Sequence, residues 1–243
     1  MSNKQYIVVT GGSGRFGLNL KKLWKKNYKF PNKNHLNILN INSILGYLKK
    51  NPTKTLVHLA GLSRPMSLHE DDIARSINLN IIGTSNVVVA CSKLNIKLIH
   101  FSTSYLYPGT KGNYKETDPL MPVNNYSWSK LGAESAVQMY KNSLILRVSM
   151  TEKPFVHKYA FKDMITNFIF HDDFIKIFEK VIAQKGILNI GGKSSSVYDF
   201  ARKYNPEIKK KLLKKNKKIT VPVNTSMNLS RLNKILKRKW KIF

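Results

Sequence analysis

Short apolar runs alternate with longer amphipathic stretches over most of the chain. The runs are rich in β-branched residues and are bounded by polar segments, which is typical of strands. They fall at Tyr6–Thr10, Thr55–Leu59, Lys97–Phe101, Leu144–Val148 and Ile187–Ile190. Strands that alternate with helices predict an α/β fold, here a Rossmann-type doubly wound parallel sheet with helices on both faces.

The stretches between these strands have helical periodicity. After the first strand, Phe16, Leu20, Leu23 and Trp24 recur at spacings that place them on one face of a helix. The stretch Asp71–Lys93 also has a helical pattern. We therefore expect helices to connect the strands.

The chain is long enough for one main domain and a small appendage. Its composition shifts after about residue 150, where 151–174 is aromatic and less regular and lysines dominate from Ile208 onward. We predict a dinucleotide-binding Rossmann domain over 1–150. Over 151–243 we predict a small, reduced C-terminal substrate-binding lobe that is interleaved with the last strands and helices of the sheet. The lysine run 208–218 is interpreted as the solvated face of a helix, with a phosphate-attracting rim as the alternative.

The net charge is strongly positive, since 42 Lys and Arg face 13 Asp and Glu, which gives +29. Such a field attracts anions. The lysines are scattered along the whole chain among many Asn and Ile residues, as AT-rich coding would produce, so we do not expect a nucleic-acid partner. Steering of an anionic substrate is the functional alternative.

The sequence lacks the signals of secretion and of membrane insertion. No charged segment followed by an apolar stretch opens it, and no run of 18 apolar residues occurs. The single cysteine, Cys91, cannot form an internal disulfide. We expect a cytoplasmic protein without membrane contact.

A metal site is not expected, because the histidines do not pair at ligand spacing. They lie far apart along the chain, and the only cysteine is isolated. Even the His-Asp-Asp sequence that begins at His171 is interpreted without a metal.

A glycine-rich segment follows the first strand directly and precedes the first helix. Gly12, Gly14 and Gly17 satisfy the pattern G-x-G-x-x-G. A pyrophosphate requires this arrangement, because the turn must be tight, the backbone must approach without Cβ atoms, and the helix amides must point at the anion. The segment therefore predicts a dinucleotide site.

The charges that follow this segment favour NADP over NAD. An NAD site usually has an acidic residue about 20 positions further on, which binds the ribose 2′-hydroxyl. Here no acidic residue precedes Glu70, and Lys26, Lys29, Lys33 and Asn37 lie near the expected position. Arg15, inside the loop, adds another cation for a 2′-phosphate, so NADP is the preferred cofactor and NAD the alternative.

Tyr126 and Lys130 are four residues apart in a segment with a good helical pattern, so both project from one face. A tyrosine hydroxyl has a pKa of about 10, and a nearby ammonium favours the phenolate. The pair can therefore exchange a proton with a substrate, and Tyr126 is the candidate general acid.

Three neighbouring hydroxyls, Ser102, Thr103 and Ser104, follow the strand Lys97–Phe101. The carboxyl ends of strands are where open α/β sheets place ligands. Spacing alone does not choose among the three, and a turn-capping role is equally open for each.

Five segments together resemble the extended short-chain dehydrogenase/reductases, and among them most closely the dTDP-4-dehydrorhamnose reductase group. The resemblance covers most of the chain. The segments are Thr10–Gly17, His58–Gly61, Ile77–Val88, Ser102–Gly109 and Glu116–Glu134. The last is the most specific, and the resemblance weakens after about residue 150.

The resemblance implies roles for particular residues. It makes Thr103, rather than its serine neighbours, catalytic, together with Tyr126 and Lys130, and it implies that Lys130 also binds the nicotinamide ribose. The positions that it places at the cofactor are Gly11, Gly12, Gly14, Arg15, Phe16, Gly17, Leu59, Ala60, Gly61 and Lys130.

The implied activity is the NAD(P)H-dependent reduction of a nucleotide-linked 4-keto-deoxysugar, with Tyr126 as general acid. Two alternatives stay open, namely a sugar-nucleotide epimerase with bound NAD and a non-catalytic NADP-binding partner subunit. The Asp-Glu pair of the 4,6-dehydratases is missing after Thr103, and Met150 replaces an aromatic residue near the expected sugar site. The family also implies a homodimer.

Overall fold

The computed structural model describes residues 6–23, 27–213 and 219–240, with the side chains of the last three left undescribed. Its main element is a six-stranded parallel sheet in the order β10-β5-β4-β3-β1-β2. The strands are β1 (Tyr6–Thr10), β2 (Tyr28–Lys29), β3 (Thr53–His58), β4 (Lys97–Thr103), β5 (Ser143–Val148) and β10 (Gly186–Ile190). This sheet confirms the predicted Rossmann-type α/β fold.

Helices connect these strands, as predicted. They are α1 (Arg15–Leu23), α2 (Ile41–Lys50), α3 (Leu68–Asp71), α4 (Ile73–Ser76), α5 (Gly83–Lys93), α6 (Asn125–Gln138), α7 (His171–Val181), α8 (Val197–Arg202) and α9 (Ser230–Trp240). A π-helical segment, η1 (Ile77–Ile82), joins α4 to α5, and a 3-10 turn, η2 (Ser104–Leu106), follows β4. The expected helix over Asp71–Lys93 is thus several helical segments, separated at Asp72. No helix in the described part of the chain has the length and apolarity needed to cross a membrane.

The chain forms two compact units that exchange segments. Unit 1 comprises 1–102, 128–145 and 184–186, and unit 2 comprises 103–127, 146–183 and 187–243. The chain therefore passes from one unit to the other inside β4, α6, β5 and β10.

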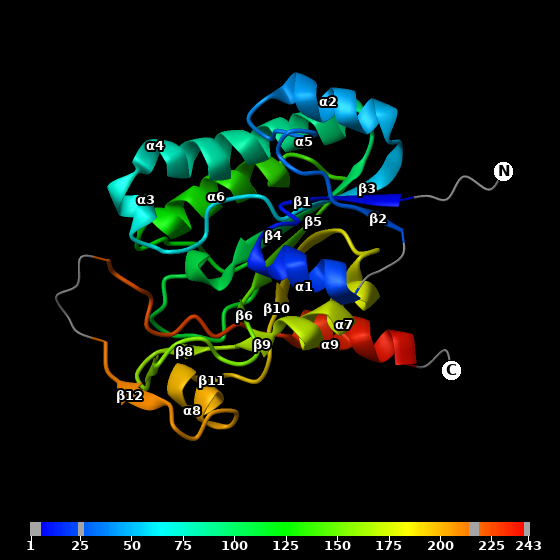
Figure 1. Ribbon diagram of the computed structural model, residues 1–243. Helices are drawn as coiled ribbons and strands as arrows, with labels where there is room; N and C mark the ends of the chain where they lie inside the picture. The colour runs from blue at the N-terminus through cyan, green and yellow to red at the C-terminus, as the bar shows by residue number, and fades with distance from the viewer. Residues whose placement is uncertain (1–5, 24–26, 214–218, 241–243) are drawn as a thin grey trace. The chain divides into compact units, whose positions relative to one another are not determined.

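Unit 1 is layered around β1, β3 and β4. Figure 1 shows α1 on one side of these strands and α2, α5 and α6 on the other. Val9, Leu56 and Leu98 have no exposed surface, because a parallel sheet covered on both faces buries successive residues of each strand. In α1, Phe16 and Leu20 are buried, but Leu23 is 48% exposed. Leu23 is the last residue of α1, and Trp24 lies outside the described residues.

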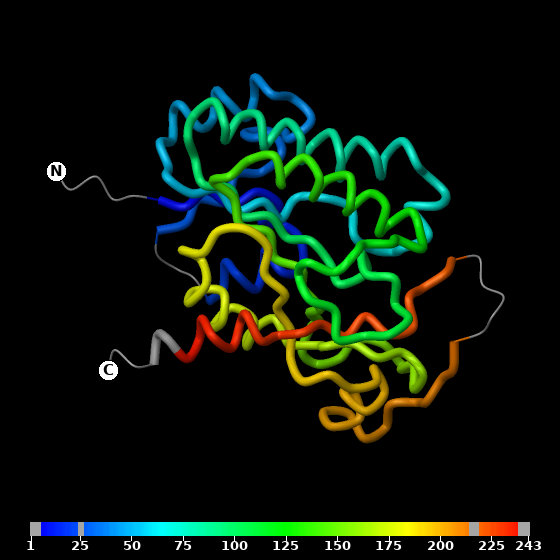
Figure 2. The backbone as a smooth tube through the Cα atoms, turned by 180° about the vertical axis from the view of Figure 1, so that it is seen from behind, coloured from blue at the N-terminus to red at the C-terminus, as the bar shows by residue number. Residues whose placement is uncertain are grey.

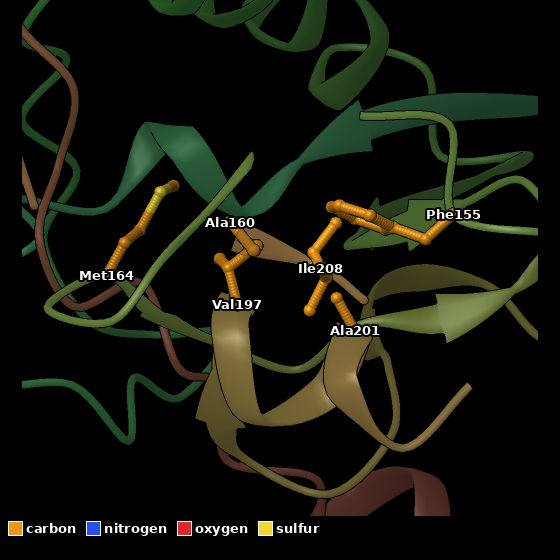
Figure 3. Close-up of a cluster of buried hydrophobic side chains, with 6 residues drawn as sticks. All are labelled: Phe155, Ala160, Met164, Val197, Ala201 and Ile208. Carbon is orange, nitrogen blue, oxygen red and sulfur yellow. The ribbon is translucent and has the colours of Figure 1, made fainter. Parts of the chain in front are cut away.

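Unit 2 contains three pairs of short strands and a separate apolar core. The pairs are β6 (Met150–Thr151) with β9 (Ile169–Phe170), β7 (Tyr159–Phe161) with β12 (Lys209–Lys211), and β8 (Ile165–Thr166) with β11 (Ser195–Ser196). Figure 3 shows the core beside them, formed by Phe155, Ala160, Met164, Val197, Ala201 and Ile208.

The lysine run from Ile208 is not helical where it is described. Lys209–Lys211 pairs in parallel with Tyr159–Phe161, because Lys209 N–H donates to the Lys158 carbonyl and Lys162 N–H to the Lys211 carbonyl. The predicted helix is therefore wrong here, although the three lysine side chains are exposed. Residues 214–218 lie outside the described part.

The segment after β4 in unit 2 is fastened by the C-terminal part of the chain. Asn224 N–H donates to the Gly109 carbonyl at 2.7 Å, and Tyr114 N–H donates to the Ser226 carbonyl at 2.9 Å. Figure 2 shows these two stretches running beside each other. A Cβ atom at Gly112, where φ is +71°, would lie 2.5 Å from Ser226 Oγ, so this contact requires glycine.

Candidate functional site

The glycine segment turns sharply between β1 and α1. Gly11 has a φ of +73°, and its carbonyl accepts from Gly14 N–H at 3.0 Å. A Cβ atom at Gly11 would lie 2.5 Å from the Ala60 nitrogen, and one at Gly17 would lie 2.5 Å from the Gly11 oxygen. Glycine is thus required at both positions by backbone-to-backbone packing.

Gly12 and Gly14 are less constrained by the protein itself. A Cβ atom at Gly14 would meet the Gly11 oxygen at 3.3 Å, and one at Gly12 would meet the side chains of Phe30 and Lys21. The first turn of α1 contains no acidic residue. A glycine-rich strand-to-helix turn that leads into a helix with no acidic residue in its first turn fits the pyrophosphate of a dinucleotide.

The segment after β3 packs against the glycine turn and is held by a residue that the sequence did not single out. Asn80, in η1, accepts from Leu62 N–H at 2.7 Å through Oδ1, and its Nδ2 donates to the Leu62 carbonyl and to Ser129 Oγ. Gly61 lies against Asn80, since a Cβ atom there would be 2.9 Å from Oδ1. Asn80 lies inside the segment Ile77–Val88, which resembles the family. This resemblance is the sequence feature that could have pointed to Asn80.

The cations proposed for a 2′-phosphate have different surroundings. Lys29 Nζ donates to Asn51 Oδ1 at 2.8 Å and lies over the Tyr6 ring, whereas Arg15 Nη2 donates to the exposed Ser63 hydroxyl at 3.2 Å. Lys33 is exposed, and Lys26 lies outside the described residues. Arg15 is therefore the cation of this set that lies within the glycine segment.

Two buried histidines lie in register on β3 and β4. His58 Nδ1 bonds to Thr10 Oγ1 at 2.8 Å and Nε2 to Thr84 Oγ1 at 3.0 Å, while both ring nitrogens of His100 lack a hydrogen-bond partner among the residues that the structure describes. Burial lowers the pKa of His58 to about 3 and holds that of His100 well below its usual range. Within the described residues, no group of three or more His, Cys, Asp or Glu side chains is arranged to hold a metal ion.

Lys130 lies on α6, one turn after Tyr126. Its ammonium donates to the Phe101 carbonyl at 2.6 Å. Desolvation lowers the pKa of Lys130 to about 8, against the opposite pull of the Glu134 carboxylate. The Phe101 ring lies 5.3 Å from that of Phe16 in α1, so Lys130 and the glycine segment meet through these two residues in unit 1.

The three hydroxyls after Phe101 have different partners. Ser102 Oγ donates to Glu134 Oε2 at 2.6 Å, and Ser104 Oγ donates to Thr225 Oγ1 at 3.4 Å. Thr103 Oγ1 accepts from Tyr105 N–H at 3.2 Å and caps η2. Among the described residues, no acceptor is recorded for the Thr103 hydroxyl proton. Thr103 is therefore the hydroxyl of the three that can still donate to a carbonyl.

The candidate residues fall into two groups. Unit 1 brings together Gly11–Gly17, Leu59–Gly61 and Lys130. Unit 2 contains Thr103 and Tyr126, and Tyr105 adjoins both, as the neighbour that Thr103 caps and as a ring 6.1 Å from the Tyr126 ring, edge to face. Helix α6 carries Tyr126 and Lys130 four residues apart, as predicted.

Known proteins of two kinds are similar to this chain. A dTDP-4-dehydrorhamnose reductase of Aggregatibacter actinomycetemcomitans is 26% identical over 151 residues, which are 60% of this chain and 51% of the relative. The methionine adenosyltransferase 2 subunit beta of Pongo abelii is 27% identical over 141 residues, which are 54% of this chain and 42% of that protein. The chain thus spans about half the length of the curated relatives that it matches.

Solved structures share the fold. The dTDP-4-dehydrorhamnose reductase of Bacillus anthracis str. Ames, in complex with NADP, superposes with a TM-score of 0.83 at 22% identity, over 95% of this chain and 93% of that one. A family model described as the RmlD substrate binding domain matches residues 5–179, well over half of the sequence. The chain belongs to the RmlD substrate binding domain family.

Proposed function

We propose that this protein is an NAD(P)-dependent oxidoreductase that reduces the keto group of a nucleotide-linked 4-keto-deoxysugar. The observation that carries the proposal is the placement of Lys130, which follows Tyr126 by one turn of α6 and whose ammonium donates to the Phe101 carbonyl at 2.6 Å. Membership of the family, and the named activity of the relatives in A. actinomycetemcomitans and B. anthracis, support it.

Each of three residues has a role in this reaction. Tyr126 donates its hydroxyl proton to the substrate oxygen, which becomes an alcohol, and the Lys130 cation stabilises the resulting phenolate. Thr103 donates a hydrogen bond that polarises the carbonyl. When bound, the reduced nicotinamide supplies the hydride for the keto carbon and is itself oxidised.

The dinucleotide is proposed to lie on the glycine turn, with Gly11–Gly17, Leu59–Gly61 and Lys130 holding it. We propose that residues 1–150 form the dinucleotide-binding part and that residues 151–243 form the substrate-binding lobe. NADP is the preferred cofactor, because Arg15 stands in the turn and no acidic residue precedes Glu70 to bind a ribose 2′-hydroxyl. Replacing Arg15 with Ala is expected to weaken NADPH binding while leaving NADH binding almost unchanged, as measured by calorimetry.

Turnover tests the proposal directly. NAD(P)H oxidation is followed with a panel of nucleotide-linked 4-keto-6-deoxysugars, for wild type and Tyr126→Phe. The variant is expected to lose turnover by at least about a hundredfold, because the general acid is gone, and to retain cofactor binding. The control is Tyr159→Phe, which removes an exposed phenol in unit 2. Equal turnover by Tyr126→Phe would exclude the assigned role.

A non-catalytic NADP-binding subunit is the second candidate, because relatives named as a subunit of methionine adenosyltransferase match the chain. In that case the protein binds NADPH but does not consume it with any substrate of the panel. A tightly held NAD that survives purification would instead favour the epimerase.

We further propose a homodimer formed through α5 and α6 of unit 1. The two helices lie side by side (Figures 1 and 2), and Gly132 of α6 lies against Ile81 of η1, the segment that leads into α5. Residues 77–92 carry no charged side chain although the chain carries +29. Exposed apolar side chains here are Val89 on α5, Trp128 on α6 and Ile82 at the end of η1. Two copies repel each other less at an uncharged apolar face than elsewhere. Light scattering is expected to show a dimer, and Trp128→Lys a monomer.

A cytoplasmic location is also proposed. Cys91 is the single cysteine of the sequence, so no disulfide forms within the chain, and burial raises the pKa of its thiol to about 12.

A further inference from the structure

A buried polar clamp joins β4 to α6 inside unit 1, through consecutive residues of the strand and consecutive turns of the helix. Phe101 accepts from Lys130 Nζ through its carbonyl, and the next residue, Ser102, donates from its hydroxyl to Glu134 Oε2. Both bonds measure 2.6 Å. Lys130 and Glu134 are four residues apart on α6, so their side chains lie on the same face.

Burial of the Glu134 carboxylate at this position is energetically unfavourable. Its side chain has no exposed surface. A carboxylate withdrawn from water destabilises the fold unless hydrogen bonds and an opposite charge compensate for the lost hydration. Its hydrogen bonds come from Ser102 at 2.6 Å and Gln138 Nε2 at 3.2 Å, and the charge opposite to it is that of Lys130.

The other titratable groups around Lys130 do not stabilise its positive charge. Histidines on neighbouring elements feel its positive charge, namely His58 on β3, His69 on α3 and His100 on β4, and burial lowers the pKa of each. In the proposed reaction, the Lys130 cation stabilises the phenolate of Tyr126, which also lies on α6. Among the described residues, Glu134 is the one carboxylate that raises the pKa of Lys130.

We propose that Glu134, anchored by Ser102, is a positioning residue that keeps Lys130 cationic and docked on the Phe101 carbonyl, and so sets the upper pH limit of the reaction. This inference rests on the proposed function, because it assigns the Lys130 cation the task of stabilising the Tyr126 phenolate.

The electrostatic balance gives the direction of the effect. Burial pulls the pKa of Lys130 down to about 8 even with Glu134 in place. An opposite charge in close range typically moves a pKa by about one unit or more. Without the carboxylate, Lys130 is expected to lose its proton near neutral pH, and the phenolate of Tyr126 loses its counter-ion.

The test compares pH profiles of NAD(P)H-dependent reduction for wild type, Glu134→Gln and Glu179→Gln. Glutamine keeps the shape of Glu134 and can still accept from Ser102. The alkaline limb of kcat/KM is expected to move down by about one pH unit in Glu134→Gln, with a loss of about tenfold above the limb and little loss below it. Glu179→Gln, which neutralises an exposed carboxylate on α7, is expected to keep the wild-type limb.

A second measurement does not depend on turnover. The pH dependence of Lys130 acylation by an amine-reactive reagent, read by peptide mass spectrometry, reports its protonation in wild type and variants. The midpoint is expected to fall in Glu134→Gln and to return toward wild type in Glu134→Asp, which restores the charge.

An unchanged midpoint with a uniform loss of activity would overturn the inference and leave Glu134 a structural residue. If no substrate is reduced at all, a shifted midpoint still supports the role of Glu134 while the reductase proposal fails. If Glu134→Gln does not fold, the comparison of Glu134→Asp with wild type decides, because a midpoint far below the wild-type value despite the retained charge would contradict the proposal.

Discussion

Lys130 in unit 1 and Arg147 in unit 2 are cations in different surroundings, since Lys130 is partly buried and Arg147 is buried. Arg147 is 2% exposed, and its guanidinium donates to the Tyr107 hydroxyl at 2.9 Å and to the Glu116 carbonyl at 3.1 Å, with the carbon of the group 5.1 Å from the Tyr107 ring centroid. Within the described part of the chain, the ammonium of Lys130 has one such bond, to the Phe101 carbonyl. A guanidinium stays charged in any protein environment, whereas an ammonium loses its proton when burial is insufficiently compensated.

The network around Arg147 continues beyond its first partners. The Tyr107 hydroxyl also donates to Asn189 Oδ1 at 2.8 Å, and Asn189 Nδ2 donates to the Tyr114 carbonyl at 2.9 Å. The Tyr107 and Tyr114 rings stack with centroids 4.8 Å apart. Arg147 therefore keeps its charge and its position, as expected of a residue with a structural role. The charge of Lys130 responds to pH, as expected of a residue that takes part in proton transfer.

The largest expected effect that separates the two cations is on catalysis. Lys130→Met is expected to lower kcat/KM by about a thousandfold, ~4 kcal/mol of transition-state stabilisation, because the Tyr126 phenolate loses its counter-ion. Steady-state kinetics on Lys130→Met and on the surface variant Lys176→Met checks this. Turnover near the wild-type level would remove Lys130 from the mechanism.

Arg147→Met is expected to lower the free energy of unfolding by about 3 kcal/mol, because the buried oxygens of Tyr107 and Glu116 lose their charged donor. Urea denaturation at constant pH measures the change. Arg202→Met, at an exposed position on α8, is the matched control and should stay within about 0.5 kcal/mol of wild type. A loss below about 1 kcal/mol in Arg147→Met would contradict the structural role.

His100 differs from both cations, because its buried side chain stays neutral. Its pKa is lowered in the folded state, so below about pH 6.5 the unfolded chain binds a proton that the folded protein does not, and stability falls as the pH falls. His100→Phe is expected to reduce this slope by about 1.4 kcal/mol per pH unit between about pH 6 and pH 4. Unfolding free energies measured across that range check it, with the exposed His35→Gln as the control. An unchanged slope would show that His100 is protonated inside the fold.

The sequence predicted most of the sheet and the position of the glycine turn, because both depend on local patterns. The runs at Tyr6–Thr10 and Lys97–Phe101 are strands, and G-x-G-x-x-G stands at the strand-to-helix junction. The roles of the individual glycines could not be read in this way. Gly11, which is not part of the motif, is required by its contact with Ala60, nearly fifty positions away in the sequence.

The residues that sequence reasoning missed are buried polar groups with distant partners. Asn80 and Glu134 look like ordinary helical residues, and only the folded chain brings Leu62 to one and Ser102 to the other. Lys209–Lys211 was misread for the same reason, since its strand pairing with Tyr159–Phe161 depends on a segment about fifty residues earlier. Composition correctly indicated that these lysines are solvated, but it did not indicate their backbone conformation.

The exposed lysines of β12 have a consequence for how the protein behaves when it is concentrated. β12 pairs with β7 in a two-stranded sheet, and a strand at a sheet edge offers unpaired backbone groups to any other chain. Lysines along such an edge oppose its pairing with a further strand, because the ammonium groups of Lys209, Lys210 and Lys211 would have to approach another chain with the same large positive charge. This strand thus protects the protein against edge-to-edge aggregation.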